Sequence, residues 1–275
     1  MRLLHQRTGR HVITFYSAAF TKPNLPFTSA INDGDISGLM NACYGLTASE
    51  RTDGGLDLIL HTPGGSIGAT EAIVSYLRQM FGKNIRVIVP QIAMSAGTMI
   101  ALSAKQIILG KQSSLGPIDP QIFGIPANLI VEEFKEAKSE LTKSSDAAAY
   151  WQIRLMKYPA TAFYQANLAV DRAKKNVTDW LLTNMFDINV NGDVEKVDRI
   201  VNHLSDSNEN KAHDRHIHKN ELIELGVNVY SLEDDQILQD LALAVHHSTC
   251  LTLTNTNAFR LIENHQGRVN VLHHS

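Results

Sequence analysis

The sequence predicts an α/β protein in which helices cover a sheet that contains parallel strands. Strand-like and helix-like segments alternate through the first half of the chain, as they do in sheets of this kind. The predicted strands near residues 56 and 85 are almost uniformly apolar, which is typical of strands buried on both faces. Each of these two strands stops abruptly, at Thr62-Pro-Gly-Gly65 and at Pro90.

Periodicity and turn residues place the individual elements. In the first half we expect strands at 11–16, 56–60, 85–89 and 106–109, and helices at 33–46, 66–81 and 95–103. Residues 21–31 contain Pro23 and Pro26 and are predicted to be a loop. The helix that starts at Ser66 should end at Gly82, a common C-terminal stop.

The second half is predicted to be mostly helical. Residues 129–186 should form helix interrupted near Pro159, followed by helices at 194–204, 220–225 and 234–247, with a polar loop at 205–211, a strand at 227–230 and short apolar runs at 251–253 and 269–272. No linker separates the two halves. We therefore expect one domain over residues 1–275, with a core at about 10–190 and a helical C-terminal extension at about 191–275.

Composition excludes several classes of protein. The 275 residues include 25 Lys and Arg against 28 Asp and Glu, and a net charge of −3 excludes a chain built around nucleic acid. Two cysteines, Cys43 and Cys250, give no disulfide framework and fit a reducing compartment. No stretch approaches 18 uninterrupted apolar residues and the N-terminus lacks a signal-peptide core, so we expect a cytoplasmic protein without a membrane span.

Two loops that follow buried strands are the candidate site, because sites form beyond the C-terminal ends of parallel strands. The first is His61-Thr-Pro-Gly-Gly-Ser66, whose glycines let the backbone come close to a ligand. The second is Gln91-Ile-Ala-Met-Ser-Ala-Gly-Thr98, which places Ser95 at a strand-to-helix bend. The Ser95 hydroxyl could act as a nucleophile, and amides near Gly65 and Ala96 could stabilise an oxyanion.

Structural roles compete with this interpretation. Gly64 and Gly65 could form only a tight turn, and Ser95 could be a helix N-cap. Two loops of similar design about thirty residues apart favour a site over either role alone. Neither loop is a G-x-S-x-G elbow or a phosphate-binding loop, and both of those motifs are absent.

Three motifs in order resemble the serine dehydrogenase proteinase family, which belongs with signal peptide peptidase A and the Clp protease proteolytic subunit in the Clp/crotonase superfamily. They are Leu60-His-Thr-Pro-Gly-Gly65, Ala93-Met-Ser-Ala-Gly-Thr98 and Leu115-Gly-Pro-Ile-Asp-Pro-Gln121. A weaker similarity covers His213-Asp214 and Glu221 to Gly226. The resemblance implies a Clp/crotonase-like spiral of ββα units and a serine peptidase that acts on peptides or loosely folded proteins. It also implies a homo-oligomer.

Residue by residue, the resemblance makes Ser95 the nucleophile and Gly65 and Ala96 the oxyanion-hole amides, and the segment after Gly116 the region that receives peptide. At the offset where the Clp subunit carries its catalytic histidine, this chain has Pro120. A Ser–Lys dyad is then required, and we choose Lys138 as the base.

A lysine base must meet a demanding condition. The pKa of a free lysine is ~10.4, whereas a useful base needs roughly 7–8, a difference of about 4 kcal/mol. Lys135, Lys138 and Lys143 stand among glutamates. Charge pairs on a solvated helix face therefore explain these lysines as well as a catalytic role does. The base must therefore be buried, or the site is assembled only in an oligomer, or catalysis is absent.

Other polar residues near the motifs have two interpretations each. His61 is an accessory candidate or a structural histidine at a strand end, and Asp119 could orient a partner or cap a turn. His213 could orient a loop near the site. The twelve histidines include no convincing set of metal ligands, so we expect neither a metal nor a cofactor.

Three functions remain open at this point. The leading hypothesis is a serine peptidase that uses Ser95. A crotonase-like acyl-CoA enzyme would use the same pair of amides to stabilise an enolate. A non-catalytic scaffold would keep the fold and bind a partner, and the absence of an obvious base motivates it.

Overall fold

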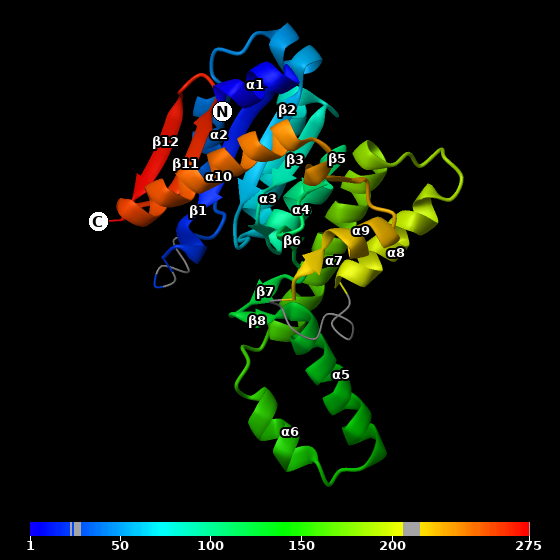
Figure 1. Ribbon diagram of the computed structural model, residues 1–275. Coiled ribbons are helices and arrows are strands. Elements are labelled where there is room, and N and C mark those ends of the chain that lie inside the picture. Colours follow the sequence, from blue (N-terminus) through cyan, green and yellow to red (C-terminus); the bar gives the residue numbers. More distant parts are fainter. Residues whose placement is uncertain (23, 25–28, 206–214, 275) are drawn as a thin grey trace.

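A seven-stranded sheet forms the centre of the protein in the computed structural model, which describes residues 1–22, 24, 29–205 and 215–274 (Figure 1). The strands are β1 (His11–Ser17), β2 (Leu56–His61), β3 (Ile85–Val89), β5 (Gln106–Leu109), β10 (Val229–Ser231), β11 (Ala258–Asn264) and β12 (Val269–His273). Their order is β10-β5-β3-β2-β1-β11-β12. The first five strands in this order are parallel to one another. Strand β11 pairs antiparallel with β1 on one side and with β12 on the other.

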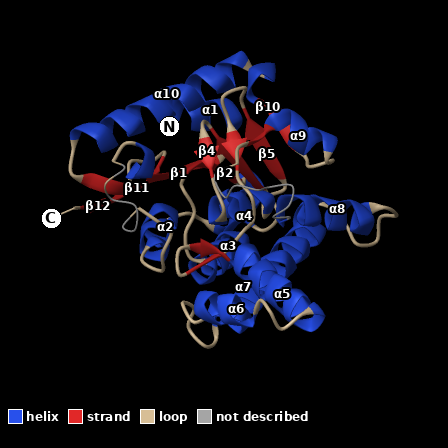
Figure 2. Cartoon of the chain, turned by 90° about the horizontal axis from the view of Figure 1, so that it is seen from below, coloured by secondary structure: helices blue, strands red, loops and turns tan. Residues whose placement is uncertain are grey.

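Helices cover both faces of the sheet (Figure 2). On one face lie α2 (Asp35–Cys43), α3 (Ile67–Phe81) and α4 (Ala96–Leu102), whose apolar residues join the largest core cluster. On the other face lie α1 (Arg2–Thr8) and α10 (Gln236–Asn255). This double cover explains why β1 and β2 are buried at every position, as their apolar sequences predict.

A second, small sheet stands at the C-terminal ends of the main strands. It consists of β4 (Ile92–Ala93), β6 (Ser114–Leu115) and β9 (Ile217–His218). A parallel β-bridge between Thr62 and Ala93 connects the end of β2 to this sheet. Each main strand from β2 to β5 therefore continues into a short second segment, and helices follow, which confirms the α/β class and the repeated ββα unit.

An arm of helices extends from this body. Figure 1 shows α5 (Ala127–Lys143) and α6 (Ala148–Leu155) running away from the sheet, and α7 (Ala162–Trp180) packing beside α5. The hairpin of β7 (Gln121–Ile122) and β8 (Ile125–Pro126) lies at the base of the arm. The remaining helices are α8 (Asp193–Ser205), α9 (Lys219–Glu224), 3₁₀ turns at Ala18–Phe20 and Leu232–Asp234, and π-helical turns at Glu50–Gly54 and Leu181–Met185.

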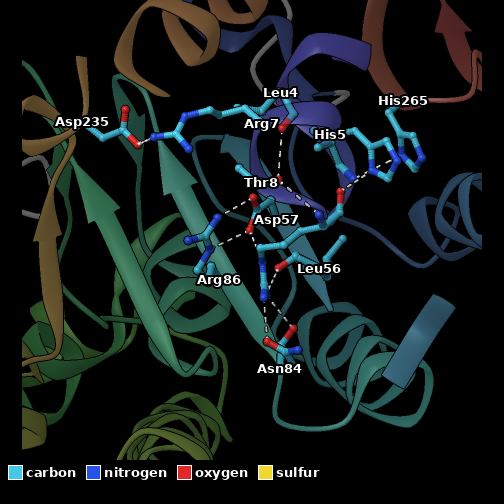
Figure 3. A network of polar contacts seen from close by, with 12 residues as sticks. Leu4, His5, Arg7, Thr8, Leu56, Asp57, Asn84, Arg86, Asp235 and His265 are labelled. Atoms are coloured by element: carbon cyan, nitrogen blue, oxygen red, sulfur yellow. Dashed lines mark hydrogen bonds and ion pairs between the residues drawn. The ribbon is translucent and has the colours of Figure 1, made fainter. Parts of the chain in front are cut away.

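The N-terminal edge of the sheet is fastened by a charged network around Asp57 (Figure 3). The fully buried Asp57 carboxylate pairs with Arg10 at 2.6 Å and with Arg86 at 2.7 Å. Arg10 also donates to the side chain and the carbonyl of Asn84. The network joins the starts of β1, β2 and β3 on the edge opposite to the candidate site.

Most of the expected elements are present. Residues 251–253 belong to the end of α10 and are not a separate apolar run, whereas α1, β11 and the short strands β4, β6, β7, β8 and β9 were not expected. Of the expected polar loop at 205–211, residues 206–211 lie outside the described residues. The helical region at 129–186 is three helices, with breaks at 144–147 and 156–161. The C-terminal region also supplies β10, β11 and β12 to the main sheet, and the division of the chain near residue 190 stays a prediction. No described helix is long and apolar enough to cross a membrane.

Candidate active site

The two predicted loops lie side by side at the C-terminal edge of the sheet. The Thr62 N–H donates to the Ile92 carbonyl at 3.2 Å, and the Met94 N–H donates to the Thr62 carbonyl at 3.0 Å. These two bonds fix the end of β2 against the segment that leads into Ser95. The parallel strands β2 and β3 thus bring together two loops that are thirty residues apart in the sequence.

Ser95 occupies a strained and accessible bend between β4 and α4. Its φ is 49° and its ψ is −112°, values that non-glycine residues rarely adopt. It is half-buried, whereas every other residue from 92 to 104 is buried. Ser95 occupies the N-cap position of α4, but its side chain makes no capping hydrogen bond to the helix. The backbone therefore presents this one serine at the surface of an otherwise closed segment.

The two glycines allow an approach that no other residue permits. A Cβ on Gly64 would lie 2.7 Å from the Met94 carbonyl oxygen and 3.0 Å from Cβ of Ser95. A Cβ on Gly65 would lie 2.2 Å from the Ile31 nitrogen on the opposite side. The glycine loop is therefore sandwiched between Ile31 and the Ser95 bend, and it is more than a tight turn.

Two backbone N–H groups remain available beside Ser95. In the parallel bridge between Ile31 and Gly65, Ile31 bonds to the Gly64 carbonyl and to the Ser66 N–H, and it leaves the Gly65 N–H unused. Ala96 is the first residue of α4, where N–H groups lack an intrahelical acceptor. Within the described ranges, neither the Gly65 nor the Ala96 N–H bonds to another residue. The arrangement fits an oxyanion hole.

A groove of about 450 Å³ begins at Gly65 and runs between α3, residues 120–122 and α7. Ile67, Ile122 and Leu168 supply apolar surface to it. Arg172 also lines the groove, and its charge is paired with Glu71. The groove therefore offers a mainly apolar surface next to the unused amide.

The sequence of residues 45–252 matches the family model described as ClpP-like SDH-type serine proteinase. The chain belongs to this family. The chain is 46% identical over 136 residues to the uncharacterized protein MJ1495 of Methanocaldococcus jannaschii, with 49% of this chain and 45% of that protein covered. It is also 46% identical over 81 residues to the uncharacterized protein MJ0137 of the same organism, with 30% of this chain and 28% of that protein covered.

Among solved structures, the chain is similar to a mutant of the 1510-N membrane-bound stomatin-specific protease. The identity is 20% and the TM-score is 0.30, over 74% of this chain and 92% of that chain. The chain spans less than half the length of the curated relatives that it matches.

The segment after Leu115 is tied to the same site. Thr98 in α4 accepts a hydrogen bond from the Gly116 N–H at 2.9 Å. Asp119 follows three residues later, is buried, and accepts a hydrogen bond from Asn128 at the start of α5 at 3.2 Å. The predicted peptide-binding segment therefore runs from α4 towards the arm.

His61 lies on the other face of the sheet from α4. Its ring stacks on Tyr16 with the ring centres 5.2 Å apart, and it stands 5.2 Å from the ring of His246 in α10. Its Nε2 bonds to the Gln91 side chain at 3.1 Å. Burial lowers the pKa of His61, which is a trait of a neutral structural histidine. No contact joins this ring to Ser95 in the described part of the chain.

The structure of one chain does not bring Lys138 to Ser95. Lys138 is exposed on α5 and lines a separate, apolar hollow of about 650 Å³ with Phe134, Leu141 and Phe163. Among the residues that the structure describes, no side chain hydrogen-bonds to the Ser95 hydroxyl. His213 lies outside the described residues.

One part of the site had no signal in the sequence. Residues 29–32 were assigned to a loop or left without a role, yet Ile31 forms one wall of the glycine loop. The two prolines of the expected loop, Pro23 and Pro26, lie outside the described residues, and they carry no information about the partner of Ile31. No group of three or more His, Cys, Asp or Glu side chains arranged to hold a metal occurs in the described ranges.

Proposed function

We propose that this proteinase cleaves peptide bonds with Ser95 as the nucleophile and the Gly65 and Ala96 N–H groups as the oxyanion hole. The observation that carries the proposal is the strained, accessible Ser95 against Gly64, in a segment that is otherwise buried. Membership of a serine proteinase family supports the same reaction class.

In this mechanism the Ser95 oxygen attacks the carbonyl carbon of the scissile peptide bond, and a base takes the hydroxyl proton. The carbonyl oxygen becomes an oxyanion between the two N–H donors. The C–N bond then breaks, the leaving amine takes the proton, and water later hydrolyses the acyl-enzyme by the same route. One N–H donor of this kind typically contributes about 10²–10³ in rate.

The substrate that the groove favours is an extended, partly apolar peptide segment. The surface formed by Ile67, Ile122 and Leu168 starts at the oxyanion-hole residue Gly65, so a side chain near the scissile bond would lie on it. The Arg172–Glu71 pair neutralises the main charge in the groove, which gives no preference for an acidic peptide.

We further propose that Lys138 is the general base and that a homo-oligomer completes the site. Lys138 is exposed to solvent in one chain. The arm exposes large apolar side chains, with Ile153 68% and Met156 76% exposed. A second chain that covers the arm would bury these residues and desolvate Lys138, which is the condition that a lysine base needs.

The lysine can be tested with a matched neighbour. Lys138→Met should reduce kcat by at least about 10²-fold, as the loss of a general base does. Lys135→Met removes an equally exposed charge from the same hollow and should leave kcat within a factor of three. Equal kcat values for the two variants would remove Lys138 from the mechanism and leave Ser95 unaffected.

The reaction itself can be tested with a fluorophosphonate probe and with fluorescein-labelled casein. The wild-type chain should acquire one phosphonyl adduct at Ser95 and should release peptides, and Ser95→Ala should do neither. Ser66→Ala is the control, because Ser66 is an exposed serine that follows Gly65 and lines the groove. An adduct on Ser66, or full casein hydrolysis by Ser95→Ala, would contradict the proposal.

A non-catalytic scaffold is the second candidate, and one observation favours it. No described side chain hydrogen-bonds to the Ser95 hydroxyl, so a single chain holds the nucleophile without a base. A scaffold predicts no adduct and no casein hydrolysis at any protein concentration, whereas the oligomer proposal predicts activity that rises with assembly.

A further inference from the structure

Of the ion pairs among the described residues, the one whose two side chains are both fully buried lies close to the glycine loop. Arg260 in β11 and Asp35 in the first turn of α2 are 0% and 1% exposed, and their Nε and Oδ1 atoms are 2.8 Å apart. Helix α2 packs on β11, which places the pair at the C-terminal end of β1. A fully buried ion pair of this kind adds little to stability, because desolvation of the two charges offsets their attraction.

The ion pair holds the backbone of residues 29–32 in place. Arg260 donates from Nη2 to the Ala30 carbonyl at 2.7 Å, and Asp35 accepts from the Asn32 N–H at 3.0 Å. Arg260 also donates to the Ser17 hydroxyl, which in turn donates to the Ser29 carbonyl at 2.8 Å. Three of these four residues therefore have a backbone group fixed by one charged cluster.

The remaining residue, Ile31, connects this fixed segment to the glycine loop of the proposed oxyanion hole. Its N–H donates to the Gly64 carbonyl at 2.8 Å, and its carbonyl accepts from the Ser66 N–H at 2.9 Å. The Gly64 carbonyl and the Gly65 N–H belong to one planar trans peptide, in which the two groups point in opposite directions. By holding the carbonyl towards itself, Ile31 directs the Gly65 N–H away from itself.

We propose that Arg260 and Asp35 are positioning residues for the oxyanion hole, and the inference rests on the proposed function of Gly65. Without the pair, Ala30 and Asn32 lose their direct anchors, Ser17 loses the arginine that holds its hydroxyl towards Ser29, and the Gly64–Gly65 peptide is free to rotate. A rotated peptide presents the Gly64 carbonyl where the Gly65 N–H was, and an oxygen at that place repels an oxyanion. Asp35 and Arg260 lie outside positions 45–252, so the family match does not include this ion pair.

The test removes both charges together, so that neither is left buried without a partner. In the double variant Arg260→Met, Asp35→Leu, apolar side chains replace the pair, a change that proteins often tolerate. With the fluorogenic peptide that the wild type cleaves fastest, we expect kcat to fall about 10²-fold or more and KM to stay within a factor of three. A merely structural role would not separate kcat from KM in this way.

Hydrogen exchange supplies a readout that does not depend on activity. Amides in 29–34 and 62–68 should exchange faster in the double variant than in the wild type, while amides of β3 keep their protection. Arg86→Met is the control, because the Arg86–Asp57 pair stands at the opposite edge of the sheet. It should leave kcat and the exchange of 62–68 unchanged even if it lowers the melting temperature.

A folded double variant with kcat within a factor of three of the wild type, or with unchanged exchange in 62–68, would overturn the inference and leave the proposed function intact. A wild-type chain that acquires no fluorophosphonate adduct at Ser95 would overturn the proposed function, and this inference with it.

Discussion

The substitution Gly65→Ala tests the geometry of the glycine loop with a single methyl group. Its Cβ would lie 2.2 Å from the Ile31 nitrogen, 2.4 Å from the Ile31 oxygen and 2.7 Å from the Ile31 Cα. Non-bonded heavy atoms require about 3.5 Å, so the two segments must separate by more than about 1 Å. The bonds from Ile31 to Gly64 and to Ser66 would then lengthen or break.

The expected decrease in kcat follows from the loss of one donor of the proposed oxyanion hole. We predict that kcat falls by about 10²–10³, which corresponds to about 2.7–4 kcal/mol of transition-state stabilisation. KM for a fluorogenic peptide should change little, since the groove beyond Gly65 keeps its lining. The assay is steady-state cleavage of that peptide, with the rate of fluorophosphonate labelling as an independent measure of the hole.

Gly68→Ala is the matched control for this experiment. Gly68 lines the same groove from within α3, and the nearest atom to its added Cβ is Oγ of Ser66 at 3.7 Å, an ordinary contact. Alanine is also the better helix former, so this variant should be at least as stable as the wild type. A Gly65→Ala enzyme with kcat within a factor of three of Gly68→Ala would refute the reasoning.

Three further predictions concern stability. Thr98→Val removes a buried hydroxyl that ties α4 to the segment after Leu115, and it should cost about 1–3 kcal/mol in urea unfolding, whereas Thr98→Ser should cost much less. Asp57→Ala leaves two partly buried arginines without their carboxylate and should cost about 3 kcal/mol; a loss below about 1 kcal/mol would be contrary to the network in Figure 3. Burial, with His61 and His247 adding to it, lowers the pKa of His246 to about 4. The unfolded chain therefore binds this proton at a higher pH than the folded chain, so the urea midpoint should fall as pH drops from about 6.5 towards 4, and the fall should be smaller in His246→Asn.

Local sequence predicted the elements on either side of Ser95. The strands at 85–89 and 106–109 have the predicted bounds, because continuous apolar runs ended by proline or by polar residues leave little choice. The bend at Ser95 was predicted from the small residues around it and from its place after a buried strand. Both signals lie within a few residues of the feature that they predict.

Long-range pairing was not predictable in the same way. Strand β11 contains Arg260, Glu263 and Asn264, which hide its strand pattern, and its partner β1 is some 245 residues away in the chain. Arg260 is a fully buried charged residue in a strand of the main sheet, and only the fold shows that Asp35 faces it. The wall formed by Ile31 depends on the same long-range contacts.

For the proposed general base, only the family resemblance gave an indication. The resemblance to signal peptide peptidase A suggested a Ser–Lys dyad, and Lys138 was chosen among three lysines on one helix, where the surrounding glutamates explain each of them as surface residues. In one chain Lys138 is exposed, and its role as the base stays a proposal.

The structure of a phosphonyl adduct would test the central claim most directly. After reaction with a fluorophosphonate, phosphorus should be bonded to Oγ of Ser95, and the phosphoryl oxygen should lie about 2.7–3.1 Å from the backbone nitrogens of both Gly65 and Ala96. An adduct on another residue, or a phosphoryl oxygen bonded to neither nitrogen, would contradict the account.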